Sequence, residues 1–443
     1  MEALESSETY GFGIRVLYKG SWGFAASDNF DKKNILRVVE RALDIARSSN
    51  IVKGKKVILD KQKPIRATYK TPVGVEPLKV PLSKKINYLL KVDKAQKVSP
   101  KIKISQTYMR TYHEEKTFAS TEGSKIDQEI TWCGGGFEAT AIDEHDLQAR
   151  TFPNSFRGQF KTGGYEVFEN LKLLENAPGV AREAVELLFA PQCPSGEFDL
   201  ILDGNQLGLQ IHESCGHATE LDRVLGYEAS FAGTSFLTLD KLGSFRYGSD
   251  IVNLTADATL PGGIATFGFD DEGVPAKRQE LVKNGILVGY MTSRETAPII
   301  KQVSNGTARA DGWSRIPLIR MTNVNLEPGA WEFDDLIADT KDGILMSTNK
   351  SWSIDDRRLN FQFGTEIAWE IKNGKKGKIL KNPTYTGITP NFWGSCDAIC
   401  SKKYWEIWGT PNCGKGQPEQ VMFTGHGASP SRFKKVQVGV GKW

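Results

Sequence analysis

The spacing of two histidines constrains the local fold of this chain more than any other feature. His212 and His217 stand five positions apart in I-H-E-S-C-G-H-A-T-E-L-D, and Glu213 directly follows the first. Positions five apart on a regular α-helix point about 140° away from each other. A straight helix therefore cannot aim both imidazoles at one ion. A π-bulge would bring them together, and Gly216 in the spacer eases such a turn, so we predict a distorted helix over residues 208–222.

The residue types in this H-E-x-x-x-H pattern indicate metal chemistry. The chain has only five histidines among 443 residues, and two of them lie here. Two imidazoles are the usual beginning of a catalytic zinc site. A carboxylate beside a ligand stands where attacking water needs a proton acceptor, which suits Glu213. The simpler interpretation is that these side chains are satisfied core polar groups or a chance match.

A catalytic zinc site usually has three protein ligands, so a third is expected. Glu220 is three residues beyond His217, and it could be a ligand or could orient a histidine from outside. Cys396, Cys400 and His426 are further candidates. Cys413 lies between Pro411 and Gly414, in what we expect to be a tight loop, and it could be a thiolate ligand or a buried inert thiol.

Composition excludes several classes of function. The net charge of +4 is too small for a nucleic-acid surface, and we expect no nucleic-acid partner. No apolar stretch approaches the length of a membrane span, and the polar start resembles no signal peptide. We therefore expect a cytoplasmic protein without membrane contact, whose six cysteines are free thiols or ligands.

Apolar periodicity predicts mixed structure in the first 190 residues. The predicted elements are a β-hairpin over 10–26, an amphipathic helix over 31–46, a second helix capped by Ser83, strands within 101–140, and helices over 165–174 and 180–189.

The segment A-P-Q-C-P-S-G at 190–196 interrupts this pattern, and we place a domain boundary there. Beyond it, strands and turns prevail, with strands predicted at 198–202, 286–292 and 362–372 and a short helix at 332–337. The predicted fold class is α+β with two domains. Residues 1–190 form a mixed α/β domain, and residues 191–443 form a mostly antiparallel β domain that carries the distorted helix.

An ordered set of motifs resembles the TldD/PmbA family of metalloproteases, in particular its metal-binding TldD branch. The set runs over nearly the whole chain: Y-G-F-G-I-R-V-L-Y-K-G-S-W-G-F-A, V-E-P-L-K-V-P-L-S-K-K-I, H-E-S-C-G-H-A-T-E-L-D, D-D-E-G-V-P, K-N-G-I-L-V-G-Y-M, I-R-M-T-N-V and C-G-K-G-Q. The chain begins close to the hairpin, and we expect it to lack the family's first several dozen residues.

The resemblance implies residue roles and partners. His212, His217 and Cys413 match the family's metal ligands, and Glu213 matches its catalytic glutamate. It implies one Zn²⁺ per chain, short or unfolded peptides as substrates, and a homodimer or a heterodimer with a homologous subunit that lacks the metal motif. His₂Cys ligation also favours zinc by its softness.

Three further residues have open roles. Arg309 and Arg320 lie in blocks that resemble family segments, and each could hold a substrate carboxylate or backbone, or form a structural salt bridge. Cys215, inside the motif, is either a core thiol or an oxidation-sensitive neighbour of the metal.

The function predicted from the sequence is hydrolysis of peptide bonds by metal-activated water, with Glu213 as general base. The alternative is a metal-stabilised peptide-binding or scaffold subunit without turnover, which needs the ligands but not the adjacent base. A metal-dependent amidase acting on small molecules is a third possibility.

Overall fold

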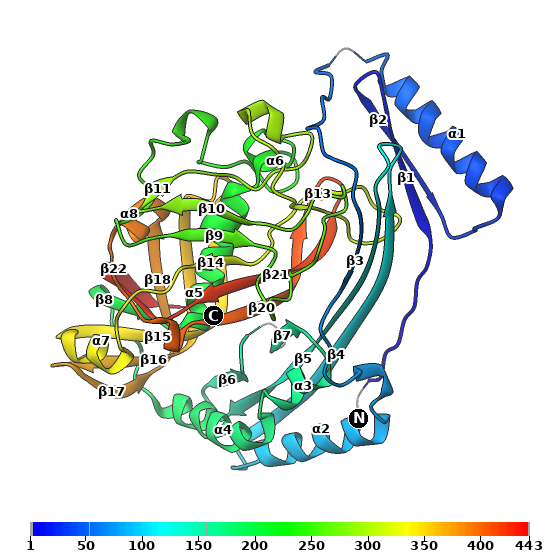
Figure 1. Cartoon of the computed structure of the whole chain (residues 1–443). Coiled ribbons are helices and arrows are strands. Elements are labelled where there is room, and N and C mark those ends of the chain that lie inside the picture. Colours follow the sequence, from blue (N-terminus) through cyan, green and yellow to red (C-terminus); the bar gives the residue numbers. More distant parts are fainter. Residues whose placement is uncertain (1–2, 53, 156–157, 442–443) are drawn as a thin grey trace.

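A computed structural model describes residues 3–52, 54–155 and 158–441 of the chain (Figure 1). It is a mixed α/β structure built from several sheets, as the α+β class predicted. Within the described residues, no helix is both long and apolar enough to cross a membrane.

The chain opens with a hairpin and a helix that form an arm in the upper right of Figure 1. β1 (Phe12–Tyr18) and β2 (Ser21–Ser27) pair antiparallel, and α1 (Lys32–Ser49) packs on them. Lys19 and Gly20 take the positive φ values that a two-residue hairpin turn requires. A side chain at Gly23 would lie 1.9 Å from a backbone oxygen of α1, so only glycine permits this packing. The predicted hairpin and amphipathic helix are confirmed.

The next segment is a five-stranded sheet with helices along its lower end in Figure 1. Its long strands β4 and β5 confirm the predicted strands. The elements are β3 (Arg66–Lys70), a 3₁₀ turn (Pro77–Lys79), α2 (Leu82–Gln96), β4 (Ile102–Ala119), β5 (Lys125–Ile142), β6 (Leu147–Phe152), β7 (Gln159–Thr162), α3 (Tyr165–Glu169) and α4 (Leu173–Phe189).

Two predictions in this segment need correction. Ser83 does not cap α2, because the helix already begins at Leu82 behind Pro81 and no side chain caps it. The predicted helix over 165–174 breaks after Glu169, where Lys172 takes a left-handed conformation, and α4 then begins at Leu173. Pro178 lies inside α4, beyond its first turn, so it has no N–H for the helical hydrogen bond to the carbonyl of Leu174.

The remaining chain surrounds the largest hydrophobic core. Five strands, β15, β8, β22, β18 and β16, pair in a closed circuit, and all these pairings except the parallel β8–β15 pair are antiparallel. The strands of this region are β8 (Gly196–Leu202), β9 (Leu254–Asp257), β10 (Arg278–Lys283), β11 (Ile286–Leu287), β12 (Ala308–Arg309), β13 (Leu318–Ile319), β14 (Val324–Leu326), β15 (Asp342–Ile354), β16 (Asn360–Lys372), β17 (Lys375–Leu380), β18 (Pro383–Ile388), β19 (Cys396–Ile399), β20 (Glu406–Lys415), β21 (Gln420–Ala428) and β22 (Ser431–Val440). Its helices are α5 (Gly204–Ile211), α6 (Leu221–Val224), α7 (Phe333–Asp339) and α8 (Thr389–Gly394).

Most predicted elements of this region are present. The strands at 198–202 and 362–372 and the helix at 332–337 are confirmed as β8, β16 and α7. The predicted strand over 286–292 is wrong in length, because β11 ends at Leu287. The chain then leaves the sheet, and Met291 makes only an isolated bridge to Glu220 beside the histidine motif.

Candidate metal centre

A helix with a widened turn carries the histidine motif. α5 begins at Asp203, whose carboxylate accepts a hydrogen bond from the N–H of Gly204 and another from the hydroxyl of Ser347 on β15. The helix changes at His212–Gly216 into a π-helical turn and then at His217–Thr219 into a 3₁₀ turn. This confirms the predicted distorted helix. A π-turn has one residue more than an α-helical turn, so two histidines five positions apart project from the same side of the helix.

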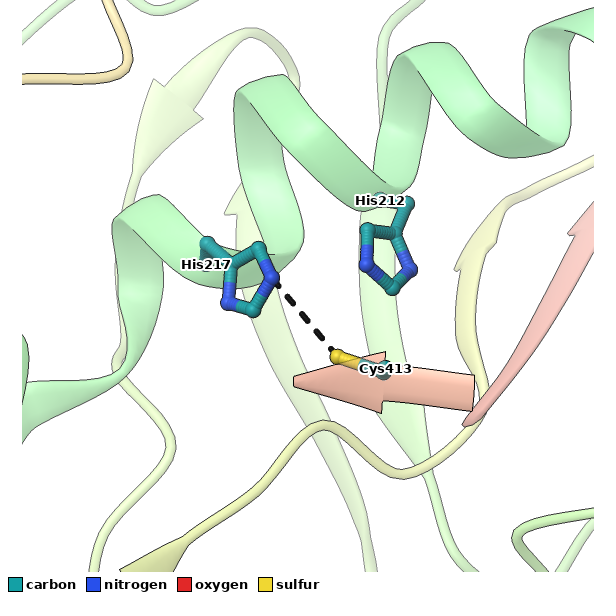
Figure 2. Close-up of side chains that lie close together, drawn as sticks. All are labelled: His212, His217 and Cys413. Carbon is teal, nitrogen blue, oxygen red and sulfur yellow. Dashed lines mark hydrogen bonds between the residues drawn. The ribbon is translucent and has the colours of Figure 1, made fainter. Parts of the chain in front are cut away.

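The π-turn brings both histidines to one cysteine. Figure 2 shows His212 and His217 projecting from the helix toward Cys413 on the neighbouring strand β20. One donor atom from each residue lies within 4.8 Å of the others, and all three side chains are buried. His217 Nε2 is 3.6 Å from Cys413 Sγ. The structure therefore places the three sequence-predicted ligands together.

Hydrogen bonds fix which ring nitrogen of each histidine is available. His426 Nδ1 must donate to the carbonyl of Val324, 3.3 Å away, so its Nε2 accepts from His212 Nδ1 at 2.8 Å. His217 Nδ1 donates to Glu220 Oε2 at 2.9 Å. Each ligand histidine thus keeps a free lone pair on Nε2. His426 and Glu220, two candidates for the third ligand, act here as orienting groups.

Cys413 lies in a strand, which corrects the predicted loop. β20 runs through residues 406–415 and pairs with β21, with a bulge between Thr410 and Cys413. Pro411 has no N–H for the ladder, which favours a bulge at this point. Arg320 donates from Nη2 to the Cys413 carbonyl at 2.5 Å. Pro411 therefore marks a bulge in the strand and not the tight loop that was predicted.

The three donors also influence one another electrostatically. Burial would raise the pKa of Cys413, but the two imidazoles and Arg320 outweigh it and hold that pKa well below its usual value. Burial also acts to lower the pKa of His212, yet the nearby thiolate raises it overall. For His217, burial prevails and its pKa falls well below the ordinary value. The thiolate and the neutral His217 match the protonation state that metal binding requires, whereas the raised pKa of His212 means that a metal would compete with a proton there.

Glu213 lies next to the cluster and has one strong partner. Its Oε2 accepts a hydrogen bond from Arg358 Nη1 at 2.7 Å, and both side chains are largely buried. Arg358 takes a left-handed backbone conformation in the loop between β15 and β16. A charge-assisted contact of this kind restricts the orientation of the carboxylate.

Behind His217, buried charges form a small network. Lys415 Nζ lies 2.7 Å from Asp222 and 3.3 Å from Glu220, and all three residues are buried. Lys415 is two residues beyond Cys413 on the same strand. One strand therefore carries the candidate ligand Cys413 and also the cation that holds Glu220, the carboxylate bound to His217.

Comparison with known proteins agrees with this geometry. The PmbA/TldA metallopeptidase C-terminal domain matches residues 195–440, the central domain of the same family matches 75–190, and its domain 1 matches 1–46. The chain belongs to the TldD/PmbA metallopeptidase family. A metalloprotease of Methanocaldococcus jannaschii is 34% identical over 90% of this chain and 85% of its own length.

More distant relatives of this TldD/PmbA chain extend the comparison. A zinc metalloprotease TldD homolog of Saccharolobus solfataricus is 26% identical over 97% of this chain and 90% of its own length. The crystal structure of TldE from Thermococcus kodakarensis shares the fold, with a TM-score of 0.70 and 17% identity over 96% of this chain and 88% of that one. The three family matches are consecutive, and the division into two domains at residue 190 stays a prediction.

The other cysteines lie outside the cluster of His212, His217 and Cys413. Cys396 and Cys400 are buried near β19, in two different hydrophobic clusters, and burial raises the pKa of Cys400 to about 12. Cys215 is fully buried in the main core, and burial raises its pKa to about 12 as well. Its surroundings are those of a core thiol.

Neither arginine forms the structural salt bridge that was one of the two roles left open for it. Among the described residues, neither Arg309 nor Arg320 has a carboxylate within 4.0 Å. Arg320 holds backbone carbonyls of Cys413 and Gln420, so it supports the ligand strand. Arg309 donates to the carbonyls of Met321 and Phe423.

Proposed function

We propose that this chain is a zinc-dependent peptidase that hydrolyses short or unfolded peptides. The observation that carries the proposal is the cluster itself. Two histidines with free Nε2 atoms and a cysteine of lowered pKa converge, with Glu213 adjacent. The family supports the reaction class, since relatives along most of the chain are named metalloproteases.

The donor set supports zinc as the metal. One ion could be shared by the three donor atoms, which lie within 4.8 Å of one another. His217 Nε2 and Cys413 Sγ are 3.6 Å apart. Imidazole and thiolate ligands together favour zinc over Mg²⁺ or Ca²⁺. Three ligands leave one position open for substrate or water.

Each residue around a bound metal would have a separate role in hydrolysis. A bound zinc ion supplies a Lewis acid for the peptide carbonyl and lowers the pKa of attacking water. Glu213 takes the proton from that water and returns it to the leaving amine. Arg358 holds the Glu213 carboxylate in place. His426 and Glu220 keep the ligand histidines in the tautomer whose Nε2 faces the metal.

The wider setting belongs to the same proposal. We place the enzyme in the cytoplasm, working as a homodimer or with a homologous subunit that lacks the metal motif. Such an assembly would admit only extended chains to the centre.

A paired measurement tests this proposal. Zinc content by elemental mass spectrometry and cleavage of an unfolded peptide are measured for wild type, Glu213→Gln and Cys413→Ser. We expect about one zinc per chain in wild type and Glu213→Gln, cleavage only in wild type, and loss of both in Cys413→Ser. Cys396→Ser is the matched control, because that buried cysteine lies outside the cluster.

The outcomes separate the alternatives. Zinc retained in Cys413→Ser would remove the third ligand from the proposal. Wild type that binds zinc but cleaves no peptide, alone or with a partner, would favour the scaffold role. Turnover of small amides instead of peptides would favour the amidase.

A further inference from the structure

An aromatic pocket lies between the long strands β4 and β5 of the five-stranded sheet and the β20–β21 pair, which carries Cys413. Its volume is about 230 Å³, below the roughly 300–1,000 Å³ of common small-molecule sites. Such a volume suits one amino-acid residue. Tyr112 and Trp132 from β4 and β5 and Phe423 from β21 form one aromatic cluster in its wall, with ring centroids 5.4 to 5.9 Å apart.

A buried arginine in the pocket wall has no carboxylate within 4.0 Å among the described residues. Arg309 is only 5% exposed, and its guanidinium lies against the rings of Phe267 and Phe423. Its hydrogen bonds all come from Nη1, so Nε and Nη2 donate to no described residue. Burial lowers its pKa to about 10, still well above neutrality, so the group is cationic. A buried cation without a counter-ion is costly and can be stabilised by a bound anion.

A second donor in the wall is also unsatisfied. Trp132 is 6% exposed, and its buried Nε1–H has no hydrogen-bond partner in the described part of the chain. Two independent donors that lack acceptors thus belong to one pocket. The Trp132 Nε1 atom has almost no exposed surface, so Arg309 is the donor that an anion in the pocket would meet.

The carboxylates of the pocket are already engaged. Asp271 pairs with Lys116 at 2.8 Å and accepts the N–H of Ala310. Asp311 accepts the N–H of Val421. Glu114, the third carboxylate of the lining, lies 3.7 Å from the same Lys116. Asp271 and Glu114 act to raise the pKa of Arg309, but neither forms a salt bridge with it, so its guanidinium can still pair with an incoming anion.

The pocket is joined to the metal centre by shared elements. β20 and β21 supply Pro411, Met422 and Phe423 to its wall, and Met422 is the cross-strand partner of Cys413. The carbonyl of Met321 binds Arg309, and residue 321 also contacts the π-turn at Gly216. A ligand held here lies beside the elements that position the metal ligands.

We propose that this pocket binds the C-terminal residue of a peptide substrate. Arg309 pairs with the terminal carboxylate, and the rings hold an apolar or aromatic side chain. A terminal residue unites a carboxylate with an apolar side chain in the room available, whereas an acidic side chain would not need the aromatic walls. The inference rests on the proposed peptidase function and adds a preference for free C-termini.

The test compares N-acetyl-phenylalanine with N-acetyl-phenylalaninamide by isothermal titration on the full chain. We expect the acid to bind at least about tenfold more tightly than the amide, because only the acid forms a charge-assisted pair. Arg309→Gln should reduce that ratio to about one. Arg309→Lys, which keeps the charge but loses the planar fork, should leave an intermediate ratio.

Controls keep this result interpretable. Arg246→Gln replaces an exposed arginine outside the pocket and should leave the ratio unchanged. Zinc content and thermal melting verify the fold of each variant. Equal binding of acid and amide, or a full preference in Arg309→Gln, would overturn the inference. Tighter binding of N-acetyl-aspartate α-amide than of N-acetyl-phenylalanine would assign the pocket to acidic side chains and overturn it too.

The two proposals fail in different ways. Peptide cleavage with no binding of the acid would overturn this inference and leave the peptidase standing. Acid-selective binding without cleavage of any peptide would overturn the peptidase, and the pocket would then serve a peptide-binding protein.

Discussion

His426 contacts the candidate metal centre without being one of its three clustered donor residues. Burial and the neighbouring His212 hold its pKa well below the ordinary value, so the ring is neutral. With Nδ1 donating to Val324, its Nε2 can only accept, and His212 must therefore carry its proton on Nδ1. The neutral imidazole of His426 thus accepts the Nδ1 proton of His212, as the carboxylate of Glu220 accepts that of His217.

We therefore expect His426→Ala to weaken zinc binding by about 10- to 100-fold, the usual effect of losing such an orienting group. His426→Gln can still accept from His212 and should lose less. Competition with a zinc chelator measures both. His113→Ala, on the edge of the central sheet and away from the cluster, serves as the control and should bind as wild type does. Unchanged affinity in His426→Ala would show that His212 needs no orienting partner.

The residues of the site were predictable to different degrees. His212, Glu213 and His217 stand together in the sequence, and the family resemblance adds Cys413. Arg358 is 145 positions from Glu213, and nothing in its neighbourhood indicates that contact. The role of His426 was equally hidden, because a tautomer is set by contacts that only the folded chain creates. Sequence patterns show local chemistry, whereas these orienting groups depend on packing between distant segments.

The widened turn depends on a glycine as well as on spacing. A side chain at Gly216 would place its Cβ 2.0 Å from Met321 Sδ, so the helix and the segment before β14 approach closely here. Met321 is fully buried and has little room to move.

We expect Gly216→Ala to destabilise the protein by about 1–3 kcal/mol through overpacking and to lower zinc occupancy. Gly216→Ala/Met321→Ala should recover zinc binding in part, since the second change restores space. Gly179→Ala in α4 is the matched control, because a Cβ there meets nothing within 4 Å. That control should stabilise by about 0.5–1 kcal/mol. Chemical denaturation measures the stability of the three variants. A Gly216→Ala variant as stable as wild type would refute the close approach.

Elements with a strong local pattern were predictable, and those set by tertiary contacts were not. The hairpin at 12–27 and α1 follow from alternation, periodicity and a K-G turn. The break between α3 and α4 has no glycine or proline to mark it. The strand that holds Cys413 reads locally as a loop, because its proline and glycines mask a bulged pairing with β21.

A carboxylate ties the start of α3 to the segment before α2. Glu166 accepts the N–H groups of Gly74, Val75 and Gly164 at 2.7 to 3.1 Å. Burial alone would raise the pKa of Glu166, but these three donors outweigh it and hold the pKa below the ordinary value.

A lowered folded-state pKa gives stability that is present above the unfolded pKa and is lost as pH falls through the folded one. We expect Glu166→Gln to lower the free energy of unfolding by about 1–2 kcal/mol at neutral pH. The difference from wild type should shrink as the pH falls below about 4.3, the unfolded-state pKa of a glutamate, and disappear once folded Glu166 is protonated. Urea unfolding across this range measures it. Glu169→Gln on the same helix is the control and should show a smaller effect, because its exposed ion pair with Lys84 is screened by solvent.

A buried ion pair joins the two large regions of the molecule. Arg150 on β6 lies 2.5 Å from Glu366 on β16, and Glu366 also accepts from the N–H and hydroxyl of Thr151. These strands lie on opposite sides of the predicted boundary at residue 190. Burial raises the pKa of Glu366 to about 7, against the lowering influence of Arg150. The contact therefore couples the packing of the two regions to the charge on one carboxyl group.

We expect Arg150→Met to lower the free energy of unfolding by about 3–5 kcal/mol at about pH 9, because it leaves a buried carboxylate without its cation. A raised folded-state pKa gives stability that is present at low pH and lost as pH rises through it. Removing Arg150 raises that pKa further, so the penalty should fall toward about pH 6. Arg150→Met/Glu366→Leu should recover most of the loss, since apolar side chains can replace a buried pair. Chemical denaturation of both variants and of Glu366→Leu gives the coupling energy as a double-mutant cycle. A penalty that does not change between about pH 6 and pH 9 would show that Glu366 does not titrate in this range and that packing alone joins the two regions.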